Sequence, residues 1–346
     1  MIFLRKILFP FALLYGWITQ FRNFLYDKGI LKSYSFDIPI IAVGNLSVGG
    51  TGKTPQIEYL VRLLSVGNKV ATLSRGYKRK SKGFLLANEN STAASLGDEP
   101  YQMHLKFPNI QVAVDADRKN GIEQLLTQKN KPEVIVLDDA FQHRRVRAGF
   151  YILLTTFDAL YIDDYLLPTG NLRESKSGAH RADLIIVTKC SSTITEAEMK
   201  VVKDKLNIGK PLFFNTISYD DSVYSLDSKI AVEELKSMSK LLIAGIANPK
   251  AFFDYLINEG DEIMAFPDHH HFSPSDLDRI KKSAKNRRII TTEKDFVRLK
   301  DHFPSSQLFY LPIRTTFIDN GALFDQKITQ YMSTVSRIIP DYSEKS

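Results

Sequence analysis

The sequence predicts an α/β protein with a larger, doubly wound α/β/α domain, a smaller α/β domain and an amphipathic helix at the N-terminus. Three observations predict this fold class. Strand-like and helix-like stretches alternate, several strand-like stretches are apolar throughout, and one of them runs into a glycine-rich turn followed by a helix. Strands that are apolar throughout are typical of parallel sheets with helices on both faces. The 346 residues are enough for two hydrophobic cores.

Residues 1–30 are expected to form a helix that lies in a membrane surface. Their apolar run, from Ile7 to Ile18, is shorter than the ~18–20 residues that cross a bilayer, and no small-residue cleavage site follows it. On a helix, one stripe carries Ile7, Phe11, Leu14, Ile18 and Leu25. Basic residues flank the apolar part, as in helices that bind membrane surfaces. The alternative is a helix packed on the protein's own core.

The larger domain is predicted to span residues 31–210. Its candidate strands are residues 38–43, 69–73, 110–114, 134–137, 151–154, 184–187 and 211–215. Its candidate helices are residues 55–65, 100–106, 118–129 and 196–206. The apolar runs VIVL and LIIV indicate strands that are buried on both faces, and therefore a mostly parallel sheet.

A polar stretch at residues 218–228 breaks this alternation and separates a second α/β unit. Strands are expected at residues 240–246 and 287–292, and helices at residues 248–260 and 273–286. We therefore predict a β linker over residues 211–228, a second α/β domain over 229–335 and a polar C-terminal tail over 336–346.

Composition and charge describe an ordinary globular protein with an anionic partner. Hydrophobic residues make up 44% of the chain, and 46 basic against 39 acidic side chains give a net charge of +7. Nucleic acid, an anionic membrane surface and a phosphorylated substrate all suit this charge. The one cysteine, Cys190, cannot form a disulfide within the chain, and a reducing, cytosolic-facing location follows.

The glycine-rich turn reads GNLSVGGTGKT over residues 44–54 and resembles the phosphate-loop pattern G-x-x-x-x-G-K-[ST]. Gly52, Lys53 and Thr54 fit the end of the pattern, whereas Ser47 stands where the first glycine is usual. In such a loop the main-chain N–H groups face the phosphates, the lysine reaches them and the threonine hydroxyl holds Mg²⁺. The predicted nucleotide-binding residues are Ser47, Val48, Gly49, Gly50, Thr51, Gly52, Lys53 and Thr54. The alternative is a glycine turn without a ligand.

Acidic residues follow a strand and open a helix. In EVIVLDDAFQHRR, Asp138 and Asp139 come directly after an apolar strand, where open α/β sheets bind ligands, so they are candidates for the Mg²⁺ site. In LGDEPYQM, Asp98 precedes Pro100, a favoured first residue of helices. Asp98 is either a helix-capping acid or a general base toward an acceptor hydroxyl. Asp138 and Asp139 could equally be turn residues.

Histidines and arginines complete the set of candidates. FPDHHHF holds three of the seven histidines, and one histidine orienting a carboxylate is more plausible there than a zinc site, because no cysteines or spaced acids accompany it. SRGY, DADRKNG and PTGNLRES place Arg75, Arg118, and Arg173 with Glu174 near strand ends or in a loop. Arginines at such places can neutralise phosphates, although solvated surface arginines are common.

Together these segments resemble the tetraacyldisaccharide 4′-kinases of lipid A biosynthesis. The resemblance extends from the N-terminal helix to about residue 299. It depends on VGNLSVGGTGKTP, SRGY, GDEP, LDDAFQHR, GNLRE, FPDHHHF and TTEKD, in this order. The family accepts a small hydroxyl residue at the position of Ser47. A P-loop kinase domain and a second α/β domain, joined by a short β linker with the active site in the cleft, are the fold that the resemblance implies.

The resemblance implies ATP-dependent phosphorylation of the 4′-hydroxyl of tetraacyldisaccharide 1-phosphate, with Mg²⁺, at the cytoplasmic face of the inner membrane. A peripheral membrane contact through the N-terminal helix is expected, with no nucleic acid and no obligate protein partner. The implied catalytic residues are Asp98 as the base, His269 as the residue that orients it, and Lys53 on the phosphates. The implied metal residues are Thr54, Asp138, Asp139 and Glu174, and the implied phosphate-contacting residues are Arg75, Arg118 and Arg173.

Two other functions fit part of the sequence. The histidine tract and the VTKC segment would suit a regulatory or metal-delivery P-loop NTPase, and the phosphate loop alone would suit a kinase of a soluble sugar or nucleoside. The amphipathic N-terminus favours neither alternative, because a soluble substrate does not require it.

Overall fold

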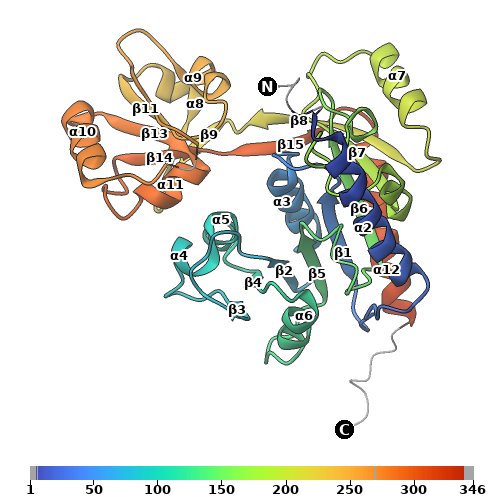
Figure 1. Cartoon of the computed structure of the whole chain (residues 1–346). Coiled ribbons are helices and arrows are strands. Elements are labelled where there is room, and N and C mark those ends of the chain that lie inside the picture. Colours follow the sequence, from blue (N-terminus) through green and yellow to red (C-terminus); the bar gives the residue numbers. More distant parts are fainter. Residues whose placement is uncertain (1–4, 6, 269, 339–346) are drawn as a thin grey trace.

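The computed structural model describes residues 5, 7–268 and 270–338, which form two sheets with helices packed on both faces of each (Figure 1). The predicted α/β fold class is confirmed. The two sheets define a larger and a smaller unit, and the strands that link them cross the middle of the molecule.

The larger sheet has nine strands among the described residues. Their order across the sheet is β15 (Ile313–Phe317), β8 (Leu212–Tyr219), β7 (Leu184–Thr188), β6 (Phe150–Thr156), β1 (Ile40–Asn45), β5 (Val134–Asp138), β2 (Val70–Ser74), β4 (Gln111–Val114) and β3 (Leu85–Leu86). All neighbours are parallel except the two outer pairs, β15 with β8 and β3 with β4. The central strand β1 therefore ends at the same edge as β5 and β6.

Helices cover both faces of this sheet because its strands are apolar on both sides. The helices of the larger unit are α3 (Lys53–Leu64), α4 (Ala93–Leu96), α5 (Asp98–Lys106), α6 (Arg118–Leu126), α7 (Glu196–Leu206) and α12 (Gly321–Ile338). On β1, Ile41 and Val43 share a core with α3 and α12, whereas Ile40 and Ala42 share another core with α6. The alternation of adjacent side chains between two cores makes the sheet doubly wound.

The smaller unit repeats this construction. Its strands, in order across the sheet, are β10 (Lys229–Ala231), β9 (Ser222–Tyr224), β14 (Leu308–Leu311), β13 (Arg288–Thr292), β11 (Lys240–Ala244) and β12 (Glu262–Ala265). Its helices are α8 (Val232–Lys236), α9 (Lys250–Leu256), α10 (Pro274–Ala284) and α11 (Glu293–Leu299). Leu242 on β11 packs with α9, while Leu241 packs with α10 and α11 on the opposite face.

The connection between the units differs from the prediction. β8 was expected to open a linker, but it pairs with β7 in the larger sheet and, antiparallel, with β15, which returns from the smaller unit. Residues 313–335 were predicted within the second domain and residues 336–338 within the tail, yet β15 and α12 lie with the larger sheet, where Phe324 and Ile328 are fully buried in its core. The chain therefore crosses between the units twice, and the pairing of strands almost a hundred residues apart is not visible in local sequence patterns.

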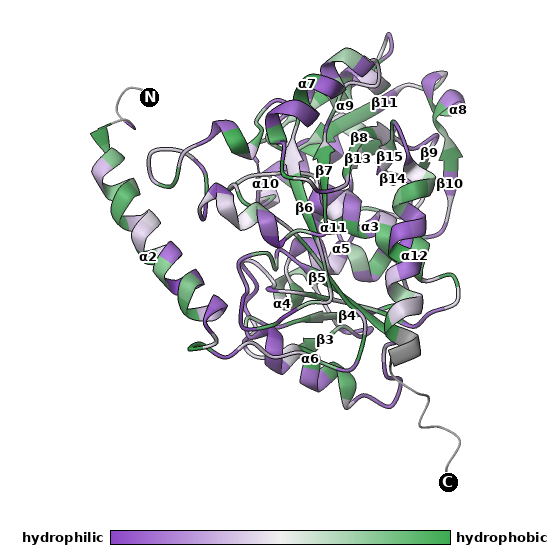
Figure 2. Ribbon diagram, turned by 90° about the vertical axis from the view of Figure 1, so that its right-hand side faces the viewer, coloured by the Kyte–Doolittle hydropathy of each residue, from purple (hydrophilic) through white to green (hydrophobic). Residues whose placement is uncertain are grey.

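The N-terminal helix α2 (Phe9–Asp27) lies along the outside of the larger unit (Figure 2). Its buried residues are the small ones, Ala12, Gly16 and Thr19, whereas Trp17 is 78% exposed and Phe21 is 63% exposed. Most of the predicted apolar stripe is exposed as well, with Phe11, Leu14 and Ile18 each 61% exposed, so the stripe is not packed on the protein's own core. This disfavours the alternative interpretation of the segment. Within the described residues, no helix combines the length and the apolar character needed to cross a membrane.

Candidate active site

The glycine-rich turn joins the end of β1 to the start of α3. Gly52 adopts a left-handed conformation, with φ of 79°, directly before the first helical residue, Lys53. Only glycine takes this conformation without strain, and it lets the chain enter the helix at once. Successive main-chain N–H groups at a helix start form a site of positive potential that suits phosphate. α3 begins two residues earlier than the sequence predicted.

The turn is held from two sides. The N–H of Val48 donates to the carbonyl of Asn171 over 2.8 Å, and the hydroxyl of Thr188, at the end of β7, donates to the carbonyl of Thr51 over 2.8 Å. Lys53 Nζ lies 3.4 Å from Asn45 Oδ1 and 3.5 Å from Asp139 Oδ1. The loop therefore has a fixed shape and directs its lysine toward the carboxyl end of β5.

The acidic pair lies beside the turn because β5 is the parallel neighbour of β1, with Asp138 opposite Val43. Asp138 is partly buried, and its Oδ1 atom is shielded from solvent and has no hydrogen-bond partner among the described residues. Burial raises the pKa of Asp138 to about 6, although Lys53 opposes the shift. A buried carboxylate oxygen without a partner is costly in an apolar setting, so it marks a place where a cation would be favourable.

Asp139 is held differently. It has a φ of 50°, and Arg173 Nη1 donates to both of its carboxylate oxygens over 2.9 and 2.8 Å. Burial alone would raise the pKa of Asp139, but the positive charges of Lys53 and Arg173 outweigh burial and lower it. Arg173 was predicted to contact phosphate and is found as the partner of this carboxylate.

The other two predicted arginines have contrasting surroundings. Arg118 is 1% exposed, and its terminal nitrogens donate to the main-chain carbonyls of Asp115 over 2.6 Å and Asp138 over 3.0 Å. Burial lowers its pKa to about 10. Arg118 thus supports the strand end from within the protein. Arg75 is exposed and lines a hollow of about 410 Å³ together with Tyr77 and Lys78.

Glu174 is fully buried beside the turn. One of its oxygens accepts from Gln142 over 2.9 Å and from Arg181 over 2.8 Å, and the other accepts from Asn23 of α2 over 2.9 Å. Gln142 also donates to the carbonyl of Asn45, the last residue of β1. Glu174 therefore joins the N-terminal helix to the strand that leads into the glycine-rich turn.

Asp98 is the first residue of α5, and the N-cap is Gly97, so Asp98 adds negative charge to the first turn and does not itself cap the helix. Its side chain makes an ion pair with Arg298 of the smaller unit. His269, the residue expected to orient Asp98, lies outside the described residues. Its neighbour His270 lies 3.0 Å from Asp276 Oδ2 at the start of α10. The described part of the chain contains no group of three or more histidine, cysteine or acidic side chains that could hold a metal.

Sequence reasoning missed several residues that surround the turn. Asn45 is fully buried, and its side-chain amide donates to the carbonyl of Ser47 over 2.6 Å. Burial and the nearby Arg118 lower the pKa of His143 to about 4, so this imidazole is neutral at neutral pH. Polar residues at the end of an apolar strand, as in GNLS, and the QHR that follows the acidic pair are signals that could have identified them.

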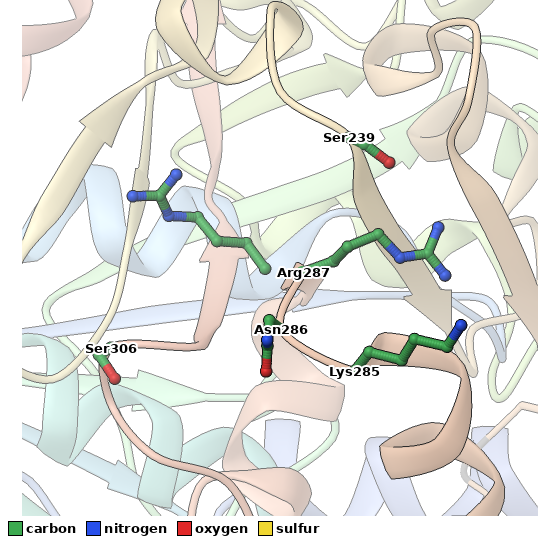
Figure 3. A pocket seen from close by; sticks show the side chains of 6 residues that line it. Ser239, Lys285, Asn286, Arg287 and Ser306 are labelled. Carbon is green, nitrogen blue, oxygen red and sulfur yellow. The ribbon is translucent and has the colours of Figure 1, made fainter.

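A larger hollow, of about 850 Å³, lies in the smaller unit and contains none of the predicted site residues. Figure 3 shows that Lys285 and Arg287 point to one side of it, away from Ser306. Arg287 is already paired with Glu262 over 2.6 Å. Because its side chains do not converge on one point, we place the candidate active site at the glycine-rich turn instead.

The protein has a doubly wound sheet, a lysine at the start of the helix after a glycine-rich turn, and acids at the end of the neighbouring strand. Together these features define the class of P-loop phosphotransferases. The family described as Tetraacyldisaccharide-1-P 4′-kinase matches residues 4–333. The chain belongs to this family. It is a kinase of lipid A biosynthesis, and the NTPase-switch alternative is not favoured.

Individual relatives agree. The tetraacyldisaccharide 4′-kinases of Flavobacterium johnsoniae and Flavobacterium psychrophilum are 64% and 61% identical, covering 95% and 96% of this chain and 97% and 98% of their own length. The crystal structure of LpxK from Aquifex aeolicus in complex with ATP is similar with a TM-score of 0.77 at 34% identity. It covers 95% of this chain and 99% of that one.

Proposed function

We propose that this chain transfers the terminal phosphoryl group of ATP to the 4′-hydroxyl of tetraacyldisaccharide 1-phosphate, forming lipid IVA at the cytoplasmic face of the inner membrane. The observation that carries the proposal is the position of Lys53, which opens α3 within 3.5 Å of the acidic pair at the end of β5. The names of the relatives and the ATP in the Aquifex aeolicus structure support both substrates.

Residues 47–54 would hold the phosphates of ATP. The main-chain N–H groups of the turn and the start of α3 supply positive potential, and Lys53 supplies a full charge. Thr188 and Val48 fix the turn through the two hydrogen bonds described above. A preformed cradle is favourable for phosphoryl transfer, which depends on positioning and charge neutralisation more than on covalent chemistry.

The residues at the end of β5 fit Mg²⁺. Asp138 Oδ1 is buried and finds no hydrogen-bond partner within the described part of the chain, and we propose that Asp138 and Thr54 are the side chains that hold the ion. Mg²⁺ commonly keeps water and phosphate ligands and takes few ligands from the protein. Bound there, the ion would neutralise charge on the phosphates. The oxygens of Asp139 and Glu174 are engaged by Arg173 and by Asn23, Gln142 and Arg181, which supports a role for these two acids in shaping the site.

Asp98 is the proposed general base. In the transfer step, the 4′-hydroxyl oxygen forms a bond to the terminal phosphorus, its proton passes to the Asp98 carboxylate, and the bond between that phosphorus and ADP breaks. Asp98 opens a helix of the larger unit and contacts the smaller unit through Arg298. A base at the junction of two units is suited to a site that excludes water when the units close.

The membrane contact is proposed for α2. Its outward side chains include Phe11, Leu14 and Ile18, each 61% exposed, and Trp17, 78% exposed. The same helix contacts the site region, because Tyr15 Oη donates to the main-chain carbonyl of Arg173 over 2.7 Å. A lipid substrate that stays in the membrane would thus reach the turn without leaving it. The net charge of +7 suits anionic headgroups.

The test is a transfer assay with the purified protein in detergent. ATP labelled at the terminal phosphate, Mg²⁺ and the lipid disaccharide 1-phosphate should give labelled lipid, and a soluble disaccharide phosphate without acyl chains should give far less product. Hydrolysis of ATP without any labelled lipid would contradict the proposal and favour a nucleotide-dependent switch.

A further inference from the structure

The two units meet where α5 of the larger unit faces α11 of the smaller unit (Figure 1). Val297 of α11 is buried in a cluster with Leu96, Tyr101 and Val114 of the larger unit. The flanks of this contact carry ion pairs, Lys106 with Glu293 and, over 3.3 Å, Lys294 with Glu99. Apolar packing with charges at its edges makes this a specific contact surface between the units.

Arg298 lies at the C-terminal end of the same contact and touches three different parts of the protein. Its side chain is 9% exposed and makes the ion pair with Asp98 through Nη2. Its Nη1 lies 3.6 Å from Asp295 Oδ1 and donates over 3.4 Å to the main-chain carbonyl of His270, in the histidine segment. One guanidinium therefore links the proposed base, its own helix and the segment FPDHHHF.

Asp295 anchors Arg298 to the smaller sheet. Asp295 is fully buried, and its Oδ2 accepts from the N–H of Gly245 over 2.8 Å and from the hydroxyl of Thr292 over 2.7 Å. Gly245 follows β11 and Thr292 ends β13, so the position of Arg298 is set by the central strands of the smaller unit. A displacement of this unit would carry the guanidinium away from Asp98.

We propose that Arg298 is a positioning residue for phosphoryl transfer, which holds the Asp98 carboxylate in its productive orientation when the smaller unit is docked on α5. The proposal rests on the proposed role of Asp98 as the base. The guanidinium contacts Asp98 through Nη2 while Nη1 contacts Asp295 and His270, so its rigid planar shape ties the Asp98 carboxylate to the smaller unit in one position. Because a misplacement of about 1 Å can cost about 10²-fold in rate, the loss of this contact should appear in kcat.

The experiment compares Arg298→Ala and Arg298→Lys with Lys294→Ala. Lys294 lies on the same helix and pairs with Glu99 across the same contact, so its variant reports what weaker docking alone does. Arg298→Ala should lower kcat about 10–100-fold with each KM within about threefold of the parent, because orientation and not substrate binding is lost. The kcat of Lys294→Ala should stay within about threefold of the parent value, because the ion pair is partly solvated and such pairs contribute little.

Arg298→Lys keeps the charge without the planar guanidinium and should recover part of the rate, which also protects the test if Arg298→Ala does not fold. The double variant Asp98→Asn/Arg298→Ala should be no slower than Asp98→Asn, because both changes act through one carboxylate. The proposal would be overturned if the reductions in kcat of the two single variants multiplied in the double variant. It would also be overturned if Arg298→Ala had the same kcat as Lys294→Ala. A fully active Asp98→Asn enzyme would instead overturn the assignment of Asp98 as the base. The single variant Asp98→Asn is enough to show this outcome.

Discussion

Lys53 Nζ lies between two oxygen atoms, 3.4 Å from Asn45 Oδ1 and 3.5 Å from Asp139 Oδ1. Asn45 ends the strand that enters the glycine-rich turn, and Asp139 follows the neighbouring strand. The lysine is therefore directed along the edge of the sheet where the phosphates of a nucleotide would lie. This relationship links the sequence motif to a defined three-dimensional site.

Lys53→Ala should abolish transfer. Removing a charge that acts on the reacting phosphates typically costs about 10²–10³-fold in kcat, while the fold should survive because Lys53 is partly exposed. Labelled lipid is measured at saturating ATP, with thermal unfolding as the check on folding. Lys200→Ala, on the exposed side of α7, is the matched control. A kcat of Lys53→Ala within tenfold of the parent value would contradict the role of Lys53 in binding phosphate.

Asp138→Asn should separate activity from stability. The asparagine lacks the charge that Mg²⁺ requires, so Mg²⁺-dependent ATP binding should fall by about 10-fold or more. At pH 8 the variant should unfold at a temperature no lower than the parent, because a neutral amide replaces a carboxylate whose buried Oδ1 has no hydrogen-bond partner in the part of the chain that the structure describes. Calorimetric titration with and without Mg²⁺ measures the first effect. ATP binding equal to that of the parent would show that Asp138 does not hold the ion.

Glu293 should make the stability of the protein depend on pH. Burial and the nearby Glu58 raise the pKa of Glu293 to about 7, although Lys106 opposes them. The folded state therefore binds this proton more tightly than the unfolded state, whose pKa lies near 4.5. The contribution to stability is complete at low pH and is lost as the pH rises from about 4.5 through about 7.

Urea unfolding at pH 5 and pH 8 checks this prediction. The loss in free energy of unfolding between the two pH values should be smaller in Glu293→Gln than in the parent, by roughly 1–3 kcal/mol. Glu233 is an exposed carboxylate of the same unit, so Glu233→Gln should show the same difference in free energy of unfolding between pH 5 and pH 8 as the parent. An equal difference in all three proteins would mean that Glu293 does not bind its proton as the structure implies.

Trp17→Glu should weaken binding to vesicles that contain anionic lipids. Burial of a large apolar side chain is worth about 1.5–3 kcal/mol, so the partition coefficient should fall about 10-fold or more. Val201→Glu, at a position of α7 that is 64% exposed, should change the partition coefficient little. Co-sedimentation with vesicles gives both values. If the two variants bound alike, the membrane contact would lie elsewhere than on α2.

Several residues at the candidate site could be predicted from the sequence because they lie within short local motifs. Lys53 and Thr54 occur within one motif, and the acidic pair directly follows an apolar strand, so the order of parallel strands brings them together. The amphipathic pattern of residues 1–30 likewise predicted a helix, and α2 forms over Phe9–Asp27.

The remaining features depend on contacts between distant segments. Arg298 is 200 residues from Asp98, and the partners of Glu174 come from α2 and from the segment after β5. The pairing of β8 with β15 similarly joins segments that no turn connects. Sequence patterns report which face of an element is apolar, but they do not specify which polar side chains meet across two units.

Phosphoryl transfer to the 4′-hydroxyl is tested by locating the new phosphate on the lipid product. The product formed from ATP, Mg²⁺ and tetraacyldisaccharide 1-phosphate is isolated and its phosphorus–proton couplings are recorded by NMR. We expect one added phosphate, coupled to the proton on the 4′ carbon, and none with the Lys53→Ala enzyme. A phosphate on any other hydroxyl, or release of inorganic phosphate with the lipid unchanged, would contradict it.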